Sequence, residues 1–364
     1  MFNDFIYYQP VKIHFGVDKI MHLNEILCSL NANKAVLICD PFFKQYGENL
    51  QADNDKIVGL FCEVQPNPIL DGVMSCTKLI EETGADAVIA LGGGSSIDTA
   101  KYASACAYSE HSVIEHFCGD LFTTNKVKII AVPTTAGTGS EVTQVSVISH
   151  GEEKKTTNHP VFMPSACIVD PKIMLSVPKN VTMQTGLDAM AHALEGYWSK
   201  NHLPITDLFA IESVRLILEN LQEAYEVGSL ESRTNMAYAS LLAGMTFALP
   251  KTAGCHACSY PLSAIYHLSH GEACAFTLDS FVRYNKDERL EELAKAVGVS
   301  SCDELADKIS YFKSLAKMKT KISELEPAVD LDKLAFEGAT HPLMQNNPVE
   351  FSTEKLRGLF EKLV

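Results

Sequence analysis

Short runs of apolar residues alternate with longer stretches of helical periodicity over the first half of the chain. Between two of these runs, residues 69–80 keep a helical period that closes at Gly84. This alternation predicts an α/β domain with a largely parallel sheet. The runs that predict buried strands are residues 35–39, 87–91, 127–132 and 166–169.

The pattern changes after Pro178. Residues 181–198, 205–225 and 233–249 carry helical periodicity, and runs rich in β-branched residues become rare. We therefore predict an α/β domain over residues 1–180 and an all-helical domain over residues 181–364. A chain of 364 residues has room for two such domains, each with a core of its own.

Two polar loops follow predicted strands and are candidates for binding phosphate. The first, GGGSSIDTAK at residues 92–101, leads into a helix, where backbone N–H groups and the positive end of the helix dipole can meet a pyrophosphate. The second, PTTAGTGSEVT at residues 133–143, places hydroxyl groups at the carboxyl end of a strand. A triple glycine alone is a weak signal, and the serines and Asp98 also suit helix caps. Two such loops together favour a dinucleotide site.

Asp40 ends the first strand of the predicted α/β domain. Its carboxylate would accept hydrogen bonds from an adenosine ribose and repel a 2'-phosphate, which favours NAD over NADP. The alternative is a turn residue before Pro41. Asp40 precedes the glycine loop, whereas the usual fingerprint places its acid about 20 residues after the glycines, so this domain departs from the standard pattern.

The formal net charge of -15 argues against nucleic acid or an anionic membrane as a partner. We find no secretory signal and no apolar run of about 18 residues, and we therefore expect a cytoplasmic protein.

Histidines and a carboxylate gather in two stretches of the predicted helical domain. Asp188 and His192 are spaced i, i+4, which puts both on one face of a helix. His256, His267 and His270 fall within one later stretch. Neutral imidazole and carboxylate suit a divalent metal that keeps a position open for substrate, so we predict one metal held by both stretches.

Eleven cysteines are scattered through apolar contexts, and we expect them to be reduced and mostly buried. Cys255 and Cys258 flank His256 and invite a thiolate metal site. Thiolates suit a closed structural zinc site better than an open catalytic one, so we do not count these two among the ligands.

Four stretches together resemble the iron-containing (group III) alcohol dehydrogenases. The likeness extends over nearly the whole chain, including residues 65–68 and 346–348. It implies the dehydroquinate synthase-like architecture: an α/β dinucleotide-binding domain and an all-helical domain, with metal and nicotinamide between them. It also implies a homodimer. The four stretches are GGGSSIDTAK, PTTAGTGSEVT, TGLDAMAHALEGYWS at residues 185–199, and the histidine-bearing stretch that ends in His270-Gly271.

The resemblance also implies roles for individual residues. The family's metal ligands fall on Asp188, His192, His256 and His270, and the metal would be iron or zinc. The implied reaction is hydride transfer between NAD(H) and a small primary alcohol or aldehyde. The implied cofactor contacts are Asp40, Gly93, Gly94, Ser95, Asp98, Thr134, Thr135 and Thr138.

Tyr260 departs from the family pattern, in which many members carry a proton-relaying histidine four residues after the third ligand. A phenol, with a reference pKa of about 10, is a poorer relay at neutral pH. We therefore expect Tyr260 to shape the substrate site. His267 is the alternative relay, or else a histidine with no part in the chemistry.

Lys251-Thr252, read with residues 256–262 and 347–349, resembles the family branch that includes phosphonoacetaldehyde reductases. A lysine there would give the anionic tail of a substrate a counter-charge. The alternative for Lys251 is a solvated lysine at the end of a helix.

Two other functions stay open on the sequence. A dehydroquinate synthase-like lyase would use a similar fold and zinc, but such sites resemble this chain less in the Asp188 and His192 pair and carry denser basic residues. A cofactor-binding relative without turnover is suggested by Tyr260. Chelator-sensitive oxidation of NADH by short aldehydes would support the dehydrogenase over both.

Overall fold

The computed structural model describes residues 4–151 and 153–363, which form two compact units. The first, which we call the sheet unit, comprises residues 8–135 and 139–174. The second, which we call the helical unit, comprises residues 4–7, 136–138 and 175–363.

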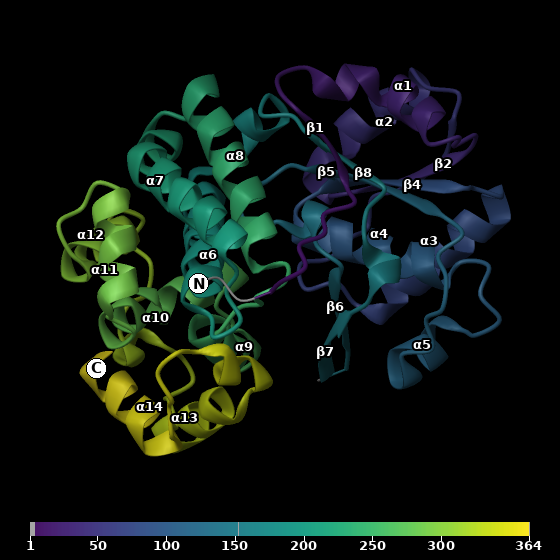
Figure 1. Ribbon diagram of the computed structural model, residues 1–364. Helices are drawn as coiled ribbons and strands as arrows, with labels where there is room; N and C mark the ends of the chain where they lie inside the picture. The colour runs from purple at the N-terminus through teal and green to yellow at the C-terminus, as the bar shows by residue number, and fades with distance from the viewer. Residues whose placement is uncertain (1–3, 152, 364) are drawn as a thin grey trace. The chain divides into compact units, whose positions relative to one another are not determined.

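The sheet unit is built on six strands in the order β1-β8-β5-β4-β2-β3, and every neighbouring pair runs parallel (Figure 1). All carboxyl ends therefore meet at one edge of the sheet. A separate antiparallel hairpin joins β6 (Val145–His150) to β7 (Glu153–Asn158). The six strands are β1 (Lys12–Phe15), β2 (Ala35–Cys39), β3 (Ile57–Phe61), β4 (Ala87–Gly92), β5 (Lys128–Pro133) and β8 (Ala166–Val169).

Both faces of the sheet are covered, which explains why its inner strands read as continuous apolar runs. Leu37, Ile89 and Ile130 share one core with residues of α1 (Leu23–Ser29) and with Phe43 beside α2 (Lys44–Ala52). The other face packs against α3 (Leu70–Thr83) and α4 (Gly94–Cys106). Gly84 ends α3 in the left-handed conformation at φ +64°, as its place in the sequence predicts.

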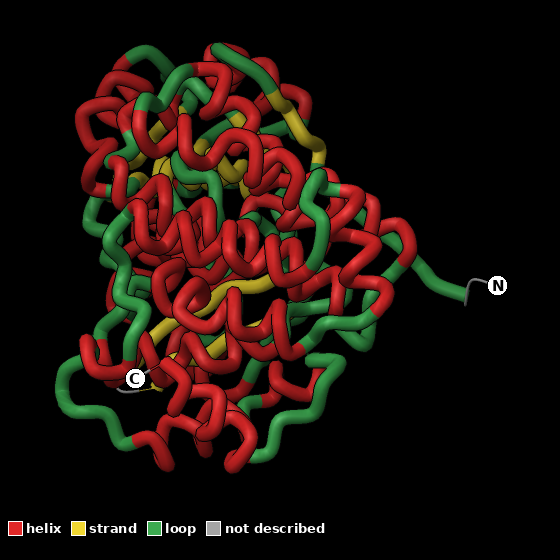
Figure 2. Tube along the Cα trace, turned by 90° about the vertical axis from the view of Figure 1, so that its left-hand side faces the viewer, coloured by secondary structure: helices red, strands yellow, loops and turns green. Residues whose placement is uncertain are grey.

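The helical unit contains no strand among its described residues, so the prediction of an all-helical second half is confirmed. Figure 2 draws the helices of the chain in red. Its centre is α6 (Lys179–Trp198), which packs against five other helices and is buried on almost every side from Gly186 to Trp198. The other helices of this part are α7 (Pro204–Glu226), α8 (Leu230–Phe247), α9 (Gly254–Tyr266), α10 (His270–Tyr284), α11 (Glu288–Ala296), α12 (Cys302–Leu315), α13 (Leu331–Thr340) and α14 (Thr353–Phe360).

Two expectations from composition can be compared with the structure. None of the helices in the described chain combines the length and the apolar character that a bilayer span requires. All eleven cysteines are free thiols and eight of them are buried, so the predicted burial of most cysteines is confirmed.

Candidate functional site

One face of α6 supplies three acidic or imidazole side chains. Asp188, His192 and Glu195 are spaced i, i+4 and i+7, so they lie along the same stripe of the helix. Their exposed fractions are 2%, 4% and 0%. Charged groups buried this deeply must have strong partners, and those partners define the site.

Glu195 acts on α9 in two ways. Its Oε1 accepts hydrogen bonds from the backbone N–H groups of Ala253 (3.0 Å), Cys255 (2.7 Å) and His256 (3.3 Å), which places a negative charge at the positive end of that helix. Its Oε2 accepts from Nδ1 of His256. The carboxylate thus fixes both the start of α9 and the orientation of the His256 ring.

His192 is oriented in the same manner by a backbone carbonyl. Its Nδ1 lies 3.2 Å from the carbonyl oxygen of Gly137, which can only accept, so Nδ1 carries the proton. Its ring stacks on Phe247 with centroids 4.2 Å apart. Burial lowers the pKa of His192 well below its usual value and keeps the ring neutral, the form that binds a metal.

These two tautomers leave a lone pair on Nε2 of each ring. The Nε2 atoms of His192 and His256 are only 3.0 Å apart. Two lone pairs at that distance repel each other, so either a proton or a metal ion has to lie between them. Burial opposes a charge on His256, but Cys274 and Glu195 outweigh it and raise the pKa of His256, so this pocket favours positive charge.

Asp188 brings a carboxylate oxygen to the same group of histidine nitrogens. Its Oδ1 lies 3.7 Å from Nε2 of His256 and 3.7 Å from Nε2 of His270. The same oxygen has no hydrogen-bond partner among the described residues, although it is fully buried. An unsatisfied buried carboxylate oxygen is costly, and a divalent metal would satisfy it. The donors therefore fit the metal that the resemblance implies.

His270 gives this group its exposed side. The His270 side chain is 40% exposed, whereas those of Asp188, His192 and His256 are at most 6% exposed. A small molecule can therefore approach the cluster from the side of His270.

Gly271 sets how closely α10 approaches α6. A Cβ atom at this position would lie 2.2 Å from the carbonyl oxygen of Gln184, so only glycine fits without moving one of the two helices. Because His270 directly precedes Gly271, this contact also sets the distance from His270 to Asp188.

We predict that Gly271→Ala lowers metal affinity by about tenfold or more and destabilises the fold by roughly 1–3 kcal/mol through overpacking. Gly358 is the matched control, since a Cβ atom there meets nothing within 4 Å. Gly358→Ala should leave metal affinity unchanged and stabilise α14 slightly. Metal titration and thermal unfolding of both variants measure these effects, and wild-type metal affinity in Gly271→Ala would contradict the argument.

Sequence reasoning overlooked three residues at this cluster. Glu195 carried a usable signal, because it follows Asp188 by seven positions on the same helical face. Cys274 lies one turn after His270 on α10, and its Sγ is 3.8 Å from Nε2 of His270. Ligand atoms of Asp188, His256, His270 and Cys274 all lie within 4.8 Å of one another.

The third overlooked residue, His341, packs against Tyr260. The two rings are 4.3 Å apart and tilted by 32°. Nδ1 of His341 accepts a hydrogen bond from the backbone N–H of Leu343 at 3.3 Å, which leaves the proton of a neutral ring on Nε2. Burial and, secondarily, the charge of His256 lower the pKa of His341. No motif marks His341, because it reaches Tyr260 only through the tertiary fold.

The remaining candidates from the sequence lie at the ends of helices. His267 is exposed and ends α9 in the left-handed conformation at φ +55°. Lys251 is exposed and also has a positive φ, +64°. Its backbone N–H donates to the carbonyl oxygen of Phe247 at 2.8 Å, and the ring of Phe247 stacks on His192.

In the sheet unit, the predicted cofactor residues gather at the carboxyl edge of β2, β4 and β5. Asp40 follows β2, and its Oδ1 accepts a hydrogen bond from the N–H of Phe42 at 2.9 Å. One of its two carboxylate oxygens thus caps the turn, as the alternative interpretation expects. The N–H of Thr134 donates to the carbonyl oxygen of Gly92 at 3.0 Å. A Cβ atom on Gly93 would lie 3.3 Å from Oγ1 of Thr135. Gly94 and Ser95 follow Gly93 and begin the first turn of α4.

Asp98 connects α4 to the second polar loop. Its Oδ1 accepts from Oγ of Ser140 at 2.7 Å, and its Oδ2 accepts from the N–H of Val147 at 3.0 Å. Nζ of Lys101 in turn donates to Ser140 at 2.8 Å. Asp98 therefore holds the loop in shape, whether or not it also contacts a cofactor. Thr138, in the same loop, belongs to the helical unit together with Gly137.

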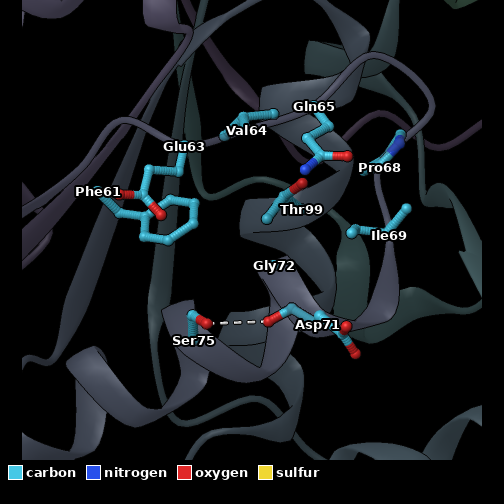
Figure 3. Close-up of a pocket in the computed structure, with 10 residues that line it drawn as sticks. All are labelled: Phe61, Glu63, Val64, Gln65, Pro68, Ile69, Asp71, Gly72, Ser75 and Thr99. Carbon is cyan, nitrogen blue, oxygen red and sulfur yellow. Dashed lines mark hydrogen bonds between the residues drawn. The ribbon is translucent and has the colours of Figure 1, made fainter.

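A cavity of about 270 Å³ lies within the sheet unit, beside the helix that carries the glycine loop (Figure 3). The side chains of Gln65 and Thr99 point toward each other, and Ser75 donates a hydrogen bond to the backbone carbonyl oxygen of Asp71. Its lining comes from the segment after β3 and from α3 and α4. The lining residues are Phe61, Glu63, Val64, Gln65, Pro68, Ile69, Asp71, Gly72, Ser75 and Thr99.

Comparison with known proteins gives consistent matches over almost the full length. A sulfoacetaldehyde reductase from Bifidobacterium kashiwanohense, solved in complex with NAD+, is 35% identical, covers 99% of both chains and superposes with a TM-score of 0.95. A choline dehydrogenase from Bacillus subtilis is 31% identical over 97% of this chain and 93% of its own. A sulfoacetaldehyde reductase from Bilophila wadsworthia is 28% identical over 98% of each chain.

Two family descriptions divide the chain between them. Residues 10–171 match the iron-containing alcohol dehydrogenase family, and residues 182–364 match the C-terminal part of the Fe-containing alcohol dehydrogenase family. These matches cover both halves of the chain, and they confirm the resemblance found in the motifs. The chain therefore belongs to the iron-containing alcohol dehydrogenase family of oxidoreductases.

Proposed function

We propose that this protein is a metal-dependent reductase that exchanges hydride between NAD(H) and a short aldehyde carrying an anionic tail. The observation that carries the metal part is the buried Oδ1 of Asp188, which faces histidine nitrogens but has no hydrogen-bond partner in the described chain. The ligands we propose are Asp188, His192, His256 and His270.

A divalent ion held there would polarise the carbonyl oxygen of the aldehyde. The chain's own part is to orient both buried imidazoles, through the Gly137 carbonyl for His192 and the Glu195 carboxylate for His256. We propose that Tyr260, held against His341, shapes the space next to the ion. His267, exposed at the end of α9, is the weaker candidate for a proton relay.

Two kinds of support favour an anionic aldehyde. Two relatives of this chain act on sulfoacetaldehyde, a short aldehyde with a sulfonate group. Phosphonoacetaldehyde, the substrate suggested by the Lys251-Thr252 motif, has the same length and a phosphonate in that place. The backbone N–H of Lys251 bonds to Phe247, whose ring stacks on His192, and we propose that the exposed Lys251 ammonium provides the counter-charge for the anionic tail.

The experiment is a panel of aldehydes matched in length, in which NADH oxidation is followed with sulfoacetaldehyde, phosphonoacetaldehyde, 3-hydroxypropanal and propanal. We expect a larger kcat/KM for the two anionic substrates. Equal or larger values for the neutral ones would reject the anionic specificity but leave the reaction class standing. Tight binding of NADH without turnover on any aldehyde would favour the alternative that this protein binds the cofactor but is not an enzyme.

We predict that Asp40→Ser lowers the KM for NADPH by about tenfold, because it removes the negative charge that repels a 2'-phosphate, an effect of roughly 1.4 kcal/mol. The KM for NADH should rise as ribose hydrogen bonds are lost. Steady-state kinetics with both cofactors measure the ratio. An unchanged ratio would show that Asp40 serves only as the cap of its turn.

We predict that Lys251→Ala raises the KM for phosphonoacetaldehyde and sulfoacetaldehyde by about tenfold, the size of a lost charge-assisted hydrogen bond. The KM for propanal should not change. Lys251→Arg is the control, since it keeps the charge and should retain most of the affinity. Equal effects on charged and neutral aldehydes would show that Lys251 is a solvated lysine at the end of a helix and does not bind the anionic tail.

A further inference from the structure

Cys274 lies among the candidate metal ligands, although the ligand set implied by the family resemblance does not include it. It follows His270 by four residues on α10, so both side chains share a face of that helix. Its side chain is fully buried, and its Sγ is 3.8 Å from Nε2 of His270. With Asp188 and His256, these two residues form a group whose ligand atoms lie within 4.8 Å of one another.

The geometry allows one ion to reach the thiol as well as the histidines. With metal–sulfur and metal–nitrogen bonds of about 2.3 and 2.1 Å, a separation of 3.8 Å corresponds to an angle of about 120° at the metal. The 3.7 Å from Asp188 Oδ1 to Nε2 of His270 gives an angle of about 120° as well. Each pair of atoms is therefore close enough to bind the same ion.

The hydrogen bonding of Asp188 also favours a cation in this space. Its Oδ1 is buried, faces the same group and has no hydrogen-bond partner in the described chain. The other cysteines near the cluster differ from Cys274. Cys255 and Cys258 are equally buried on α9, but the structure includes neither in a group of ligand atoms within its described residues. Cys258 instead packs close to Gly338 of α13.

We propose that Cys274 is a sulfur donor to the metal, in addition to the carboxylate and imidazoles, so that this chain has a mixed N/O/S site. On binding, the S–H bond breaks, a sulfur–metal bond forms, and the proton leaves to the solvent. A thiolate in an open catalytic site is compatible with known zinc chemistry. Because thiolate is a soft ligand, Cys274 favours zinc over manganese or magnesium at this site.

This inference rests on the proposed metal site, and the experiment separates the two. Metal-stripped full-length protein is loaded without oxygen with one equivalent of Co²⁺, and the bound metal is counted. We expect one ion per chain and a sulfur-to-cobalt charge-transfer band in the near ultraviolet. Cys274→Ser should still bind the ion but lose the band, whereas Cys258→Ser, the matched buried thiol, should keep it.

The outcomes separate cleanly. One bound cobalt without the band in the wild type, or a band that survives in Cys274→Ser, would overturn the role of Cys274 and leave the metal site intact. No stoichiometric cobalt would reject the metal site and the inference together. If Cys274→Ser does not fold, X-ray absorption of the zinc-loaded wild type decides, since a sulfur neighbour at about 2.3 Å is expected only with Cys274 bound.

Discussion

Asp188→Asn is expected to lose stoichiometric metal and to reduce kcat/KM more than roughly 100-fold, because losing a ligand should exceed the 10–100-fold effect of losing an outer partner. The asparagine keeps the size of the side chain but removes the charge that Oδ1 presents to the histidines. Elemental analysis of the purified variant and NADH-dependent reduction of an aldehyde measure the two effects.

Asp279→Asn is the control for this variant. Asp279 lies on α10 and pairs with the buried Lys313 at 2.7 Å, so its loss removes a carboxylate in the same unit. We expect lower stability from it but full metal content. A metal-replete, active Asp188→Asn would show that Asp188 does not bind the ion.

Glu195→Gln is expected to lower metal affinity by roughly 10–100-fold, the usual effect of removing the partner that orients a metal-binding histidine. The amide oxygen of glutamine can replace Oε1 at the start of α9, but its NH2 group cannot accept from Nδ1 of His256. The His256 ring then favours the tautomer with its proton on Nε2, where the metal needs a lone pair.

A purely structural role for Glu195 would give a different result. Thermal unfolding of Glu195→Gln reports the loss at the helix start, and metal titration reports the loss at His256. We expect metal addition to restore activity at high concentration, since the ligands themselves remain. Activity that stays lost at saturating metal, or metal affinity equal to that of the wild type, would contradict the orienting role.

The fold was largely predictable from hydrophobic patterns. The four buried strands and the helices of residues 181–249 are confirmed within a few residues, because strands covered on both faces and long helices leave clear periodicities. The sequence reasoning did not assign β1 and β3, which are the two edge strands and are partly exposed. β1 alternates polar and apolar residues over only four positions, and Gly59 interrupts the apolar run of β3, so neither strand leaves a clear pattern.

Only the part of the site that lies in recognisable motifs could be predicted from the sequence. Spacing along one helix brought Asp188 and His192 together, and the motif likeness added His256 and His270. The His192 tautomer is set by the backbone carbonyl of Gly137, and a pattern of side chains cannot predict such a backbone contact. His341 likewise reaches Tyr260 from a distant segment, and a single sequence gives no sign of such a pairing.

We propose above all that the reaction requires one divalent ion, held at Asp188 and the histidines. The most direct test is to strip the protein of metal, add back Zn²⁺ or Fe²⁺ in steps, and follow NADH oxidation by an aldehyde at each step. We predict no activity in the stripped protein and a linear rise that levels off at one ion per chain. Full activity in the metal-free protein would show that the reaction needs no metal ion.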